Sequence, residues 1–385
     1  MTNQSTRMAQ DLVGSPPTVL AIESSCDETA CAVVRGRDVL ASVVSSQIEI
    51  HAPFGGVVPE LASRSHLDAV VLVVQEALRV AIETSGRPMR LGPQPTGIDA
   101  IAVTEAPGLV GALLVGTQMA RGLAAATGLP ILGIHHMEGH LFSASLNDAD
   151  IHAESFAPHL ALLVSGGHTE LVHVKGLGDY TILGATRDDA VGEAYDKVSK
   201  MLGLGYPGGP VIDRLAAEGC GDRIAFPRSM LRHPGFDFSF SGLKTAVMLH
   251  VERHGQPTDR AALTDLCASF QAAVVDVLVT KTLAARKETG CQRVHVVGGV
   301  AANRGLAMAL ERAAAVDGFT LVIPPLRYCG DNAAMIAAAG CARFVRLTKG
   351  SQYRGQDPSV DVRSTLALDD ERLRLDPLGR EAGDR

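Results

Sequence analysis

Apolar residues along the chain occur mainly as short runs separated by polar turns that are often rich in glycine. Residues 19–22 and 30–34 are two such runs, and the turn between them, 23–29, carries three acidic residues. This pattern predicts a β-hairpin with an acidic tip. The elements expected to follow are a third strand at 38–47, a long helix from Pro59, a buried strand at 99–103 and a helix rich in glycine and alanine.

The second half of the chain repeats this order. Residues 160–164 and 170–174 predict another hairpin, closed by a turn that contains Ser165, Gly166 and Gly167. A strand at 293–297, a glycine turn at 298–304 and a helix at 305–315 follow later. Because hairpin, strand, glycine turn and helix occur twice, we expect two related α/β lobes with a cleft between them.

The same pattern sets the expected domain limits. We expect a disordered N-terminal extension at 1–17, a first lobe at 18–158 completed by a helix at 331–347, a second lobe at 159–330 with an insertion at 185–256, and a disordered tail at 348–385. The tail is assigned as disordered because it is charged and low in core-forming residues.

Composition narrows the class of protein. The 385 residues include 35 Lys and Arg against 42 Asp and Glu, so the net charge of −7 argues against nucleic-acid binding over the whole surface. The seven cysteines are scattered without a C-x-x-C pair, which favours free thiols in a reducing compartment. Residues 1–17 lack the apolar core of a signal peptide, and the apolar stretch 69–82 is interrupted by charged residues. We therefore expect a cytoplasmic protein that does not span a membrane.

Three histidines stand close together after the apolar run 130–134. If a helix starts near His135, His136 and His140 lie at i and i+4 on one face, a spacing that lets two imidazoles hold one metal ion. The alternative is two unrelated histidines near a helix end, and the third histidine favours the metal. Zinc proteases place their catalytic Glu directly after the first His, where this chain has Met137, so the motif argues against a protease.

The glycine turns are candidates for binding an anion. Ser165-Gly166-Gly167 and Gly298-Gly299 bring backbone N–H groups close together, as phosphate binding requires, although each turn alone is more simply a tight hairpin turn. Their matching positions in a duplicated fold favour a nucleotide cleft. The G-x-G-x-x-G match at 203–208 is rejected, since it follows an expected helix at 193–202 whereas the dinucleotide fingerprint follows a strand.

Several polar residues keep two interpretations at this point. Asp196 could accept a hydrogen bond from a ribose hydroxyl or pair with Lys200 at i+4, and Asp331 could be a plain helix N-cap. The insertion is locally basic, which fits either an RNA-facing patch or a solvated face; the residues concerned are Arg223, Arg228, Arg232, His233 and Lys244.

Taken together, nine of these stretches closely resemble the TsaD family of tRNA N6-adenosine threonylcarbamoyltransferases. They are IESSCDETA, VPELASRSH, HHMEGH, LVSGGHTEL, GEAYDKVSK, GYPGGP, FSFSGLKTA, GGVAANR and CGDNAAMIA, in this order between residues 19 and 347. The resemblance implies an α/β fold with two duplicated ribonuclease-H-like lobes of the actin/Hsp70/sugar-kinase type around a nucleotide cleft.

The resemblance also implies a reaction: transfer of the threonylcarbamoyl group from threonylcarbamoyl-AMP to N6 of the adenosine 3′-adjacent to the anticodon, in tRNAs that read codons beginning with adenine, with release of AMP. His136, His140 and Asp331 would hold one divalent metal ion, usually iron, with zinc as the alternative. Asp27 and Glu28 fall at the acidic hairpin and are the candidates for the base. The residues implied in substrate binding are Leu163, Val164, Ser165, Gly166, Gly167, Asp196, Gly209, Asp213 and Asn303.

As partners, the resemblance implies tRNA, a TsaB-like paralogue and a TsaE-like ATPase, with no membrane contact. Three other functions are alternatives. An O-carbamoyltransferase that uses carbamoyl-adenylate has a similar pair of lobes but generally carries extra domains, a metalloprotease needs the missing Glu, and a non-enzymatic paralogue would lack the histidine motif.

Overall fold

The computed structural model describes residues 16–89, 91, 97–146, 157–348 and 360–374. In this part of the chain two compact units are formed. Unit 1 is drawn from Met1–Gln47, Val57–Phe156 and Asp331–Arg385, and unit 2 from Ile48–Gly56 and Ala157–Gly330. Unit 1 is therefore built from both ends of the chain, and unit 2 mostly from its middle.

A five-stranded mixed sheet forms the centre of unit 1, in the order β3-β2-β1-β4-β5. Strand β2 pairs antiparallel with both β1 and β3, whereas β4 pairs parallel with β1 and β5 parallel with β4. The predicted hairpin is confirmed. The strand bounds are Thr18–Glu23 for β1, Glu28–Arg35 for β2, Asp38–Ser46 for β3, Ala100–Ala106 for β4 and Ile131–His135 for β5.

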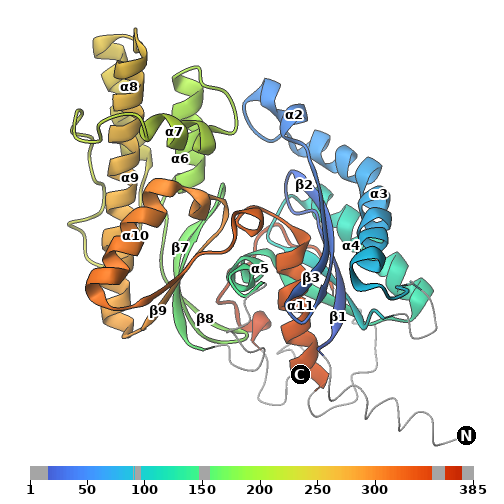
Figure 1. Cartoon of the computed structure of the whole chain (residues 1–385). Helices are drawn as coiled ribbons and strands as arrows, with labels where there is room; N and C mark the ends of the chain where they lie inside the picture. Colours follow the sequence, from blue (N-terminus) through green and yellow to red (C-terminus); the bar gives the residue numbers. More distant parts are fainter. Residues whose placement is uncertain (1–15, 90, 92–96, 147–156, 349–359, 375–385) are drawn as a thin grey trace, which may run out of the picture. The chain divides into compact units, whose positions relative to one another are not determined.

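Helices cover both faces of this sheet (Figure 1). Helix α3 (Pro59–Ser85) and helix α4 (Val110–Thr127) pack on the face to which Leu20 and Ile22 point. Helix α11 (Ala333–Thr348) lies on the opposite face, and its Gly340 approaches the sheet so closely that a Cβ atom there would stand 2.9 Å from Ala102 Cβ. The short helix α5 (His136–Ser143) packs against α11.

Unit 2 repeats the strand order of unit 1. Its strand order is β8-β7-β6-β9-β10, in which β7 pairs antiparallel with both β6 and β8, and β9 and β10 run parallel to β6. The two-lobed α/β duplication predicted from the sequence is thereby confirmed. The strand bounds are His159–Val164 for β6, Thr169–Gly176 for β7, Asp179–Ala185 for β8, Arg293–Val297 for β9 and Thr320–Val322 for β10.

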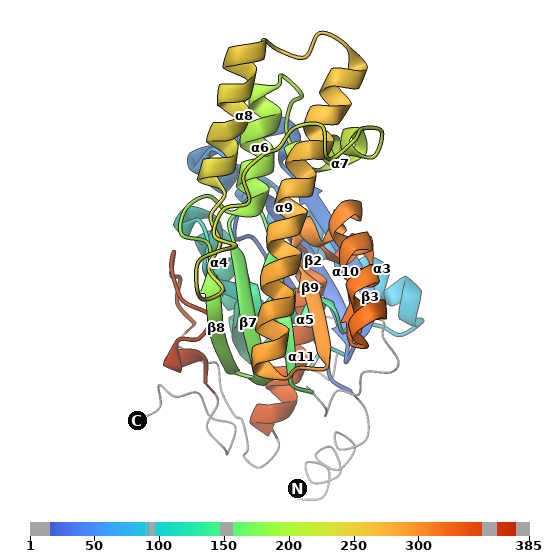
Figure 2. The same cartoon turned by 90° about the vertical axis from the view of Figure 1, so that its left-hand side faces the viewer.

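The longest helix described in unit 2, α9 (Arg260–Thr289), packs on β6 and β7 and contributes buried residues such as Phe270 and Leu278 to the hydrophobic core. Figure 2 shows α9 lying over the sheet of unit 2. By length and composition α9 could span a membrane, but 61% of its apolar window is buried inside the structure, as in a core helix. The other helical elements of unit 2 are α2 (Ile48–His51), η1 (Ala52–Phe54), α6 (Val191–Met201), α7 (Gly208–Ala216), α8 (Ser241–His254), η2 (Gly299–Ala302), α10 (Arg304–Asp317) and η3 (Leu326–Tyr328).

The expected disorder at both ends needs correction where the structure describes them. Pro17 already continues β1, since its carbonyl accepts the Gly36 N–H at 2.8 Å. Residues 360–374, which include η4 (Glu371–Leu373), pack on unit 1 with Val360, Leu368 and Leu373 at most 5% exposed. A few apolar side chains, widely spaced among charged ones, are enough to anchor this segment. The expectation for 1–15, 349–359 and 375–385 lies outside the described residues.

Candidate metal and nucleotide sites

The junction of β5 and α5 places three histidines in different surroundings. His135 is the N-cap of α5, where its Nδ1 accepts the Met137 N–H at 3.2 Å and its Nε2–H donates to the Leu366 carbonyl at 3.0 Å. Both ring nitrogens of His135 are thus engaged by backbone groups, and His135 is not a candidate ligand. His136 is the first residue of α5, and His140 lies one turn further along the same face of the helix, as their spacing predicts.

His136 and His140 converge on Asp331, which directly precedes α11. The Nε2 atoms lie 3.4 Å (His136) and 3.2 Å (His140) from Asp331 Oδ1. One ligand atom from each of the three residues fits within 4.8 Å of the others, which defines a candidate metal site. The N-cap interpretation of Asp331 is wrong, because the Met335 N–H is accepted instead by the side chain of Asn332, at 3.0 Å.

The donor set fits a metal ion. His140 is fully buried, and although its Nε2 lies 3.2 Å from Asp331 Oδ1, neither ring nitrogen makes a hydrogen bond of good geometry to another described residue. A buried polar group left without a hydrogen bond is costly, and ligation of a cation would remove that cost. Two imidazoles and one carboxylate are ligands that divalent iron or zinc both accept.

Glu23, at the end of β1, belongs to the same site although the sequence did not single it out. Its Oε2 lies 3.0 Å from His136 Nδ1, with the Ser25 hydroxyl 3.2 Å from the same nitrogen. A carboxylate that holds one imidazole nitrogen turns the other toward a metal, as in many carboxylate–histidine–metal arrangements. The only hint in the sequence was its place in the acidic hairpin turn.

Burial and neighbouring charges shift the pKa values of His136 and Asp331 in the candidate metal site. Burial disfavours the imidazolium, yet the carboxylates of Glu23 and Asp331 raise the pKa of His136 well above its usual value. Burial would likewise raise the pKa of Asp331, but the charge of His136 and the contacts with both imidazoles hold it well below its usual range. Two carboxylates facing two histidines therefore attract one positive charge, which a proton or a cation can supply.

The acidic turn predicted to carry the base lies at the start of β2. The Asp27 carbonyl accepts the Gln47 N–H at 3.0 Å, and Glu28 accepts a hydrogen bond from the Ser46 hydroxyl at 3.1 Å. Burial, with the charges of Asp27 and Asp331, raises the pKa of Glu28 to about 9. His66, from α3, supports the turn by donating to the Cys26 carbonyl at 2.9 Å.

In unit 2 the two glycine turns follow neighbouring parallel strands. Leu163 of β6 pairs with Val297 of β9, so that both turns extend from the same edge of the sheet. Gly298 has φ +95°, and a Cβ atom there would stand 2.4 Å from the Val164 carbonyl oxygen, which only glycine avoids. Ligands of open α/β sheets bind beyond such carboxyl ends of strands, so the pairing favours a ligand site over two plain turns.

Helix α6 begins against the first of these turns. The Gly192 N–H donates to the Ser165 carbonyl at 3.2 Å, while the Val191 N–H donates to the Thr169 hydroxyl at 2.8 Å. Gly166 and Gly167 have no atom within 4 Å of the position a Cβ would take, so their exposed side is open. The open turn beside a helix N-terminus suits a phosphate group.

The remaining residues predicted to bind the substrate make hydrogen bonds within unit 2. Asp196 on α6 accepts the Gly208 N–H at 2.7 Å, which links it to the segment that precedes Gly209. Asp213 binds Arg304 through Nε at 2.8 Å. Asn303 caps α10 through Leu306 N–H at 2.9 Å and donates to Gln271 at 2.8 Å.

These contacts bear on the sequence interpretations. Residues 203–208 follow α6 and lead into α7, so the rejection of a dinucleotide fingerprint is confirmed. Both polar ends of the Asn303 amide already have protein partners, and Gln271 joins it to Asp213 through a 3.2 Å hydrogen bond. Gln271, on α9, carries no motif in the sequence that would mark it as part of this site.

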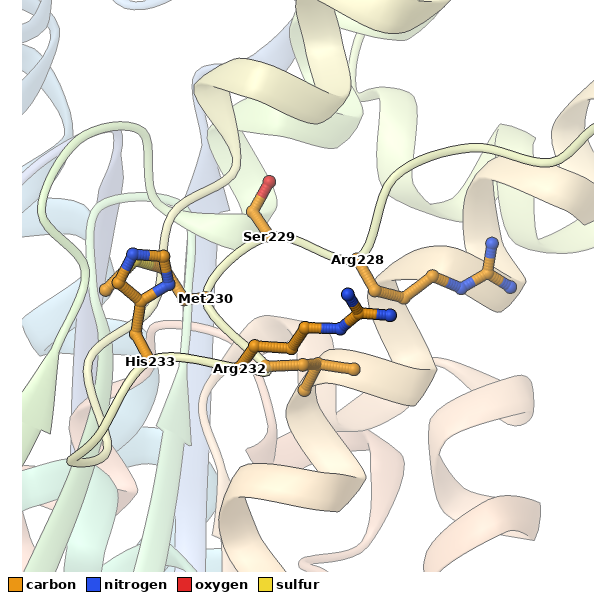
Figure 3. A pocket seen from close by; sticks show the side chains of 6 residues that line it. Arg228, Ser229, Met230, Arg232 and His233 are labelled. Atoms are coloured by element: carbon orange, nitrogen blue, oxygen red, sulfur yellow. The ribbon is translucent and has the colours of Figure 1, made fainter.

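The basic segment of the insertion is partly neutralised. Ion pairs join Arg223 to Asp265, Arg228 to Asp276 and Lys244 to Asp189. Arg232 and His233 line an open pocket of about 510 Å³ together with Arg228, Ser229, Met230 and Leu231 (Figure 3). The side chain of Arg232 makes no ion pair with another described residue, so its positive charge is available at the surface.

The fold and sites define a class: a two-lobed α/β protein with glycine turns at the carboxyl ends of parallel strands and a His-His-Asp candidate metal site. The sequence profile of TsaD, tRNA N6-adenosine threonylcarbamoyltransferase, matches residues 38–338. The chain belongs to this family, a family of acyl-group transferases.

Relatives of that name match most of the chain. The protein of Syntrophotalea carbinolica is 54% identical over 325 residues, which is 84% of this chain and 91% of that relative. The Bacillus subtilis protein is 50% identical over 352 residues, 91% of this chain and 97% of that relative.

Similar solved structures support the fold alone. A structure of full-length HypF in the phosphate- and nucleotide-bound form superposes with a TM-score of 0.56 at 12% identity, and HypF of T. kodakarensis with 0.54 at 13%. Each match covers 86% of this chain, but the chain spans only 55% and 48% of the length of these two proteins.

Proposed function

We propose that this protein transfers the threonylcarbamoyl group from threonylcarbamoyl-AMP to N6 of the adenosine next to the anticodon, on its 3′ side, in tRNAs that read codons beginning with adenine. The observation that carries the proposal is family membership at 50–54% identity together with the His136, His140 and Asp331 cluster in unit 1. We place the reaction in the cytoplasm.

Unit 2 is proposed to hold the adenylate. The residues from Leu163 to Gly167 would receive the phosphate and acyl end, since Gly166 and Gly167 are open and the N-terminus of α6 adjoins them. Asp196, Gly209, Asp213 and Asn303 would hold the ribose and adenine. The hydrogen bonds that join Asn303 and Asp213 to Gln271 would keep these two side chains in place for the nucleotide.

Unit 1 is proposed to hold one divalent metal through His136, His140 and Asp331, with iron as the ion and zinc as the alternative. When bound, such an ion supplies positive charge that polarises substrate oxygens. Glu23 keeps the His136 ring oriented through Nδ1. His136 and His140 are buried, whereas the Asp331 side chain is partly exposed and leaves the ion accessible from that side.

The reaction itself needs no covalent enzyme intermediate, because the adenylate is already an activated mixed anhydride. The adenosine amine attacks the carbonyl carbon, a C–N bond forms, the bond from that carbon to the phosphate oxygen breaks, and AMP leaves. The amine proton must go to a base. Asp27 or Glu28 is proposed for this role; the raised pKa of Glu28 means that it has to give up its own proton first.

Partner proteins are part of the proposal. A TsaB-like paralogue and a TsaE-like ATPase would assist binding of tRNA or release of product, since the chain itself is acidic. Helices α3 and α4 each leave an i,i+4 pair of apolar side chains exposed, Leu67 with Val71 and Val110 with Leu114. These two pairs are proposed as the docking surface for the paralogue.

The experiment that tests the activity is nucleoside analysis of tRNA by mass spectrometry after depletion of the protein. Threonylcarbamoyladenosine should disappear and return on expression of the wild-type chain, while the His140→Ala variant should not restore it. Unchanged tRNA after complete depletion contradicts the proposal. Appearance of a carbamoylated small molecule as the product, from purified protein, would instead select the O-carbamoyltransferase.

A further inference from the structure

The segment 360–374, here named the C-terminal strap, is bound to unit 1 along much of its length. Val360 and Leu368 are buried, the Arg363 N–H donates to the Glu105 carbonyl at 3.0 Å, and Gly108 N–H donates to the Ser364 carbonyl at 3.3 Å. The strap lies beyond residues 38–338, which carry the match to the family profile. Two of its carbonyl groups reach side chains that lead to the candidate metal site.

The first of these contacts ends on His135. The carbonyl of Leu366 accepts only, so the His135 Nε2 that lies 3.0 Å from it carries the proton. The Nδ1 atom is then an acceptor, as required to cap α5 through Met137 N–H. The strap therefore selects the tautomer that fastens the first turn of α5, the turn that begins with His136.

The second contact ends on Arg343, a buried residue of α11. One NH2 donor of Arg343 reaches the Leu373 carbonyl at 3.3 Å, and the guanidinium also binds both oxygens of Glu138, at 2.7 and 3.2 Å. Glu138 stands between His136 and His140 on α5 and points away from them. The guanidinium thus ties α5 to α11, the helix that begins just after Asp331.

We propose that the C-terminal strap is a positioning element for the metal ligands. By fixing His135 and Arg343 it holds α5 and α11 in the relation that aims His136 and His140 at Asp331. Groups that orient metal ligands without touching the ion typically change metal affinity by about 10–100-fold when they are removed. The inference rests on the metal site of the proposed function, and concerns what keeps that site assembled.

The test compares two truncated chains by titration with Zn²⁺ in a calorimeter. A chain that ends at residue 359 lacks the strap, and a chain that ends at residue 374 keeps it and serves as the matched control. We expect the first to bind Zn²⁺ about tenfold more weakly and the second to match the full chain. A synthetic peptide of residues 360–374, added to the shorter chain, should restore the affinity. Circular dichroism and the visible spectrum of bound Co²⁺ report the fold and the ligand geometry.

The outcomes test the role of the strap and the assignment of the metal site separately. Equal Zn²⁺ affinity and equal Co²⁺ spectra in a folded 1–359 chain overturn the role of the strap and leave the site intact. A full-length chain that binds no metal removes the metal assignment, and the strap's role with it. If the 1–359 chain does not fold, the Leu373→Ala variant, which loosens the strap at its Arg343 end, is titrated instead; unchanged affinity there also overturns the proposal.

Discussion

Glu138 Oε2 lies 2.7 Å from Arg343 Nε in a position where the two side chains are 0% and 2% exposed. A buried ion pair contributes little net stability, because both charges lose their hydration, but breaking it leaves one charge buried and unpaired. A variant that removes only one partner should therefore be much less stable than a variant that replaces both partners by apolar residues.

Arg343→Met should lower the free energy of unfolding by about 3–5 kcal/mol, since the Glu138 carboxylate loses its partner. The double variant Glu138→Leu with Arg343→Met should recover most of that loss. Chemical denaturation measures both, and Arg79→Met, which removes an exposed pair with Glu76, is the control that should change far less. An Arg343→Met variant as stable as the wild type would contradict the prediction.

Unit 2 contains a stacked histidine pair that makes stability depend on pH. His159 and His295 have ring centroids 3.8 Å apart, with an interplanar angle of 23°, and both are buried. Burial lowers the pKa of His159 to about 4, and burial next to His159 lowers that of His295 well below its usual value. The folded protein therefore keeps both rings neutral at pH values where an unfolded chain protonates them.

The direction in which stability changes with pH follows from this difference in protonation. Above about pH 6.5 neither state binds these protons, and stability is unaffected; as pH falls from 6.5 to 4, only the unfolded state gains them, so stability decreases. For His159 alone the decrease should reach about 3 kcal/mol at pH 4. His295→Leu should flatten the acid limb of a denaturation series, whereas His254→Gln, at the exposed end of α8, should not. An acid limb that stays as steep in His295→Leu rules out the pair as its source.

Periodicity was sufficient to predict the elements and the duplication, because both are written in local patterns: the hairpin 19–34 became β1 and β2, and Pro59 begins α3. The metal cluster was also accessible, since His136 and His140 are one helical turn apart. The role of Glu23 could not be predicted, because Glu23 and His136 are 113 residues apart in sequence and meet only where β1 and β5 end in the folded sheet. Such a long-range contact leaves no periodic pattern in the sequence.

The strap and the Asn303 network were missed for related reasons. Val360, Leu366, Leu368 and Leu373 are too irregularly spaced to predict a helix or strand, although all are buried. Asn303, a proposed ligand residue in a glycine turn, is also an N-cap, and its amide contacts Gln271 of a helix distant in sequence. A polar residue in a turn has the same appearance in sequence whether it serves a ligand or a helix end.

Asp196, which accepts a hydrogen bond from the Gly208 N–H, is predicted to bind the nucleotide in addition. Asp196→Ala should weaken AMP binding at least about tenfold, because a hydrogen bond to a charged group is worth about 1.5–3 kcal/mol. Asp196→Asn keeps an acceptor for the Gly208 N–H and should weaken binding less. Calorimetry with AMP measures both, and Lys200→Ala should bind normally. Normal affinity in Asp196→Ala would leave it only the role of holding α7.

The isolated chain is predicted to turn over poorly. Its 35 basic residues are outnumbered by 42 acidic ones, so most of the affinity for tRNA must come from elsewhere. Addition of the paralogue should raise turnover, and Leu67→Lys with Val71→Lys should remove that stimulation without changing AMP binding. Met308→Lys, at an exposed apolar residue of α10, is the control. Full multiple turnover by the purified chain alone would contradict the prediction.

The last prediction distinguishes the role of His140 as a metal ligand from the role of His135 as the N-cap of α5. His140→Ala removes a ligand whose nitrogens have no hydrogen bond to another described residue, so it should abolish metal binding and tRNA modification together while the fold persists. His135→Asn should behave differently, since Asn also caps a helix but cannot reach the Leu366 carbonyl in the same way; metal affinity should fall without being lost. Elemental analysis of the purified proteins decides the first case and a Zn²⁺ titration the second. A His140→Ala protein that retains a full equivalent of metal, or a metal-free wild type with full activity, would place the ion elsewhere or remove it from the reaction.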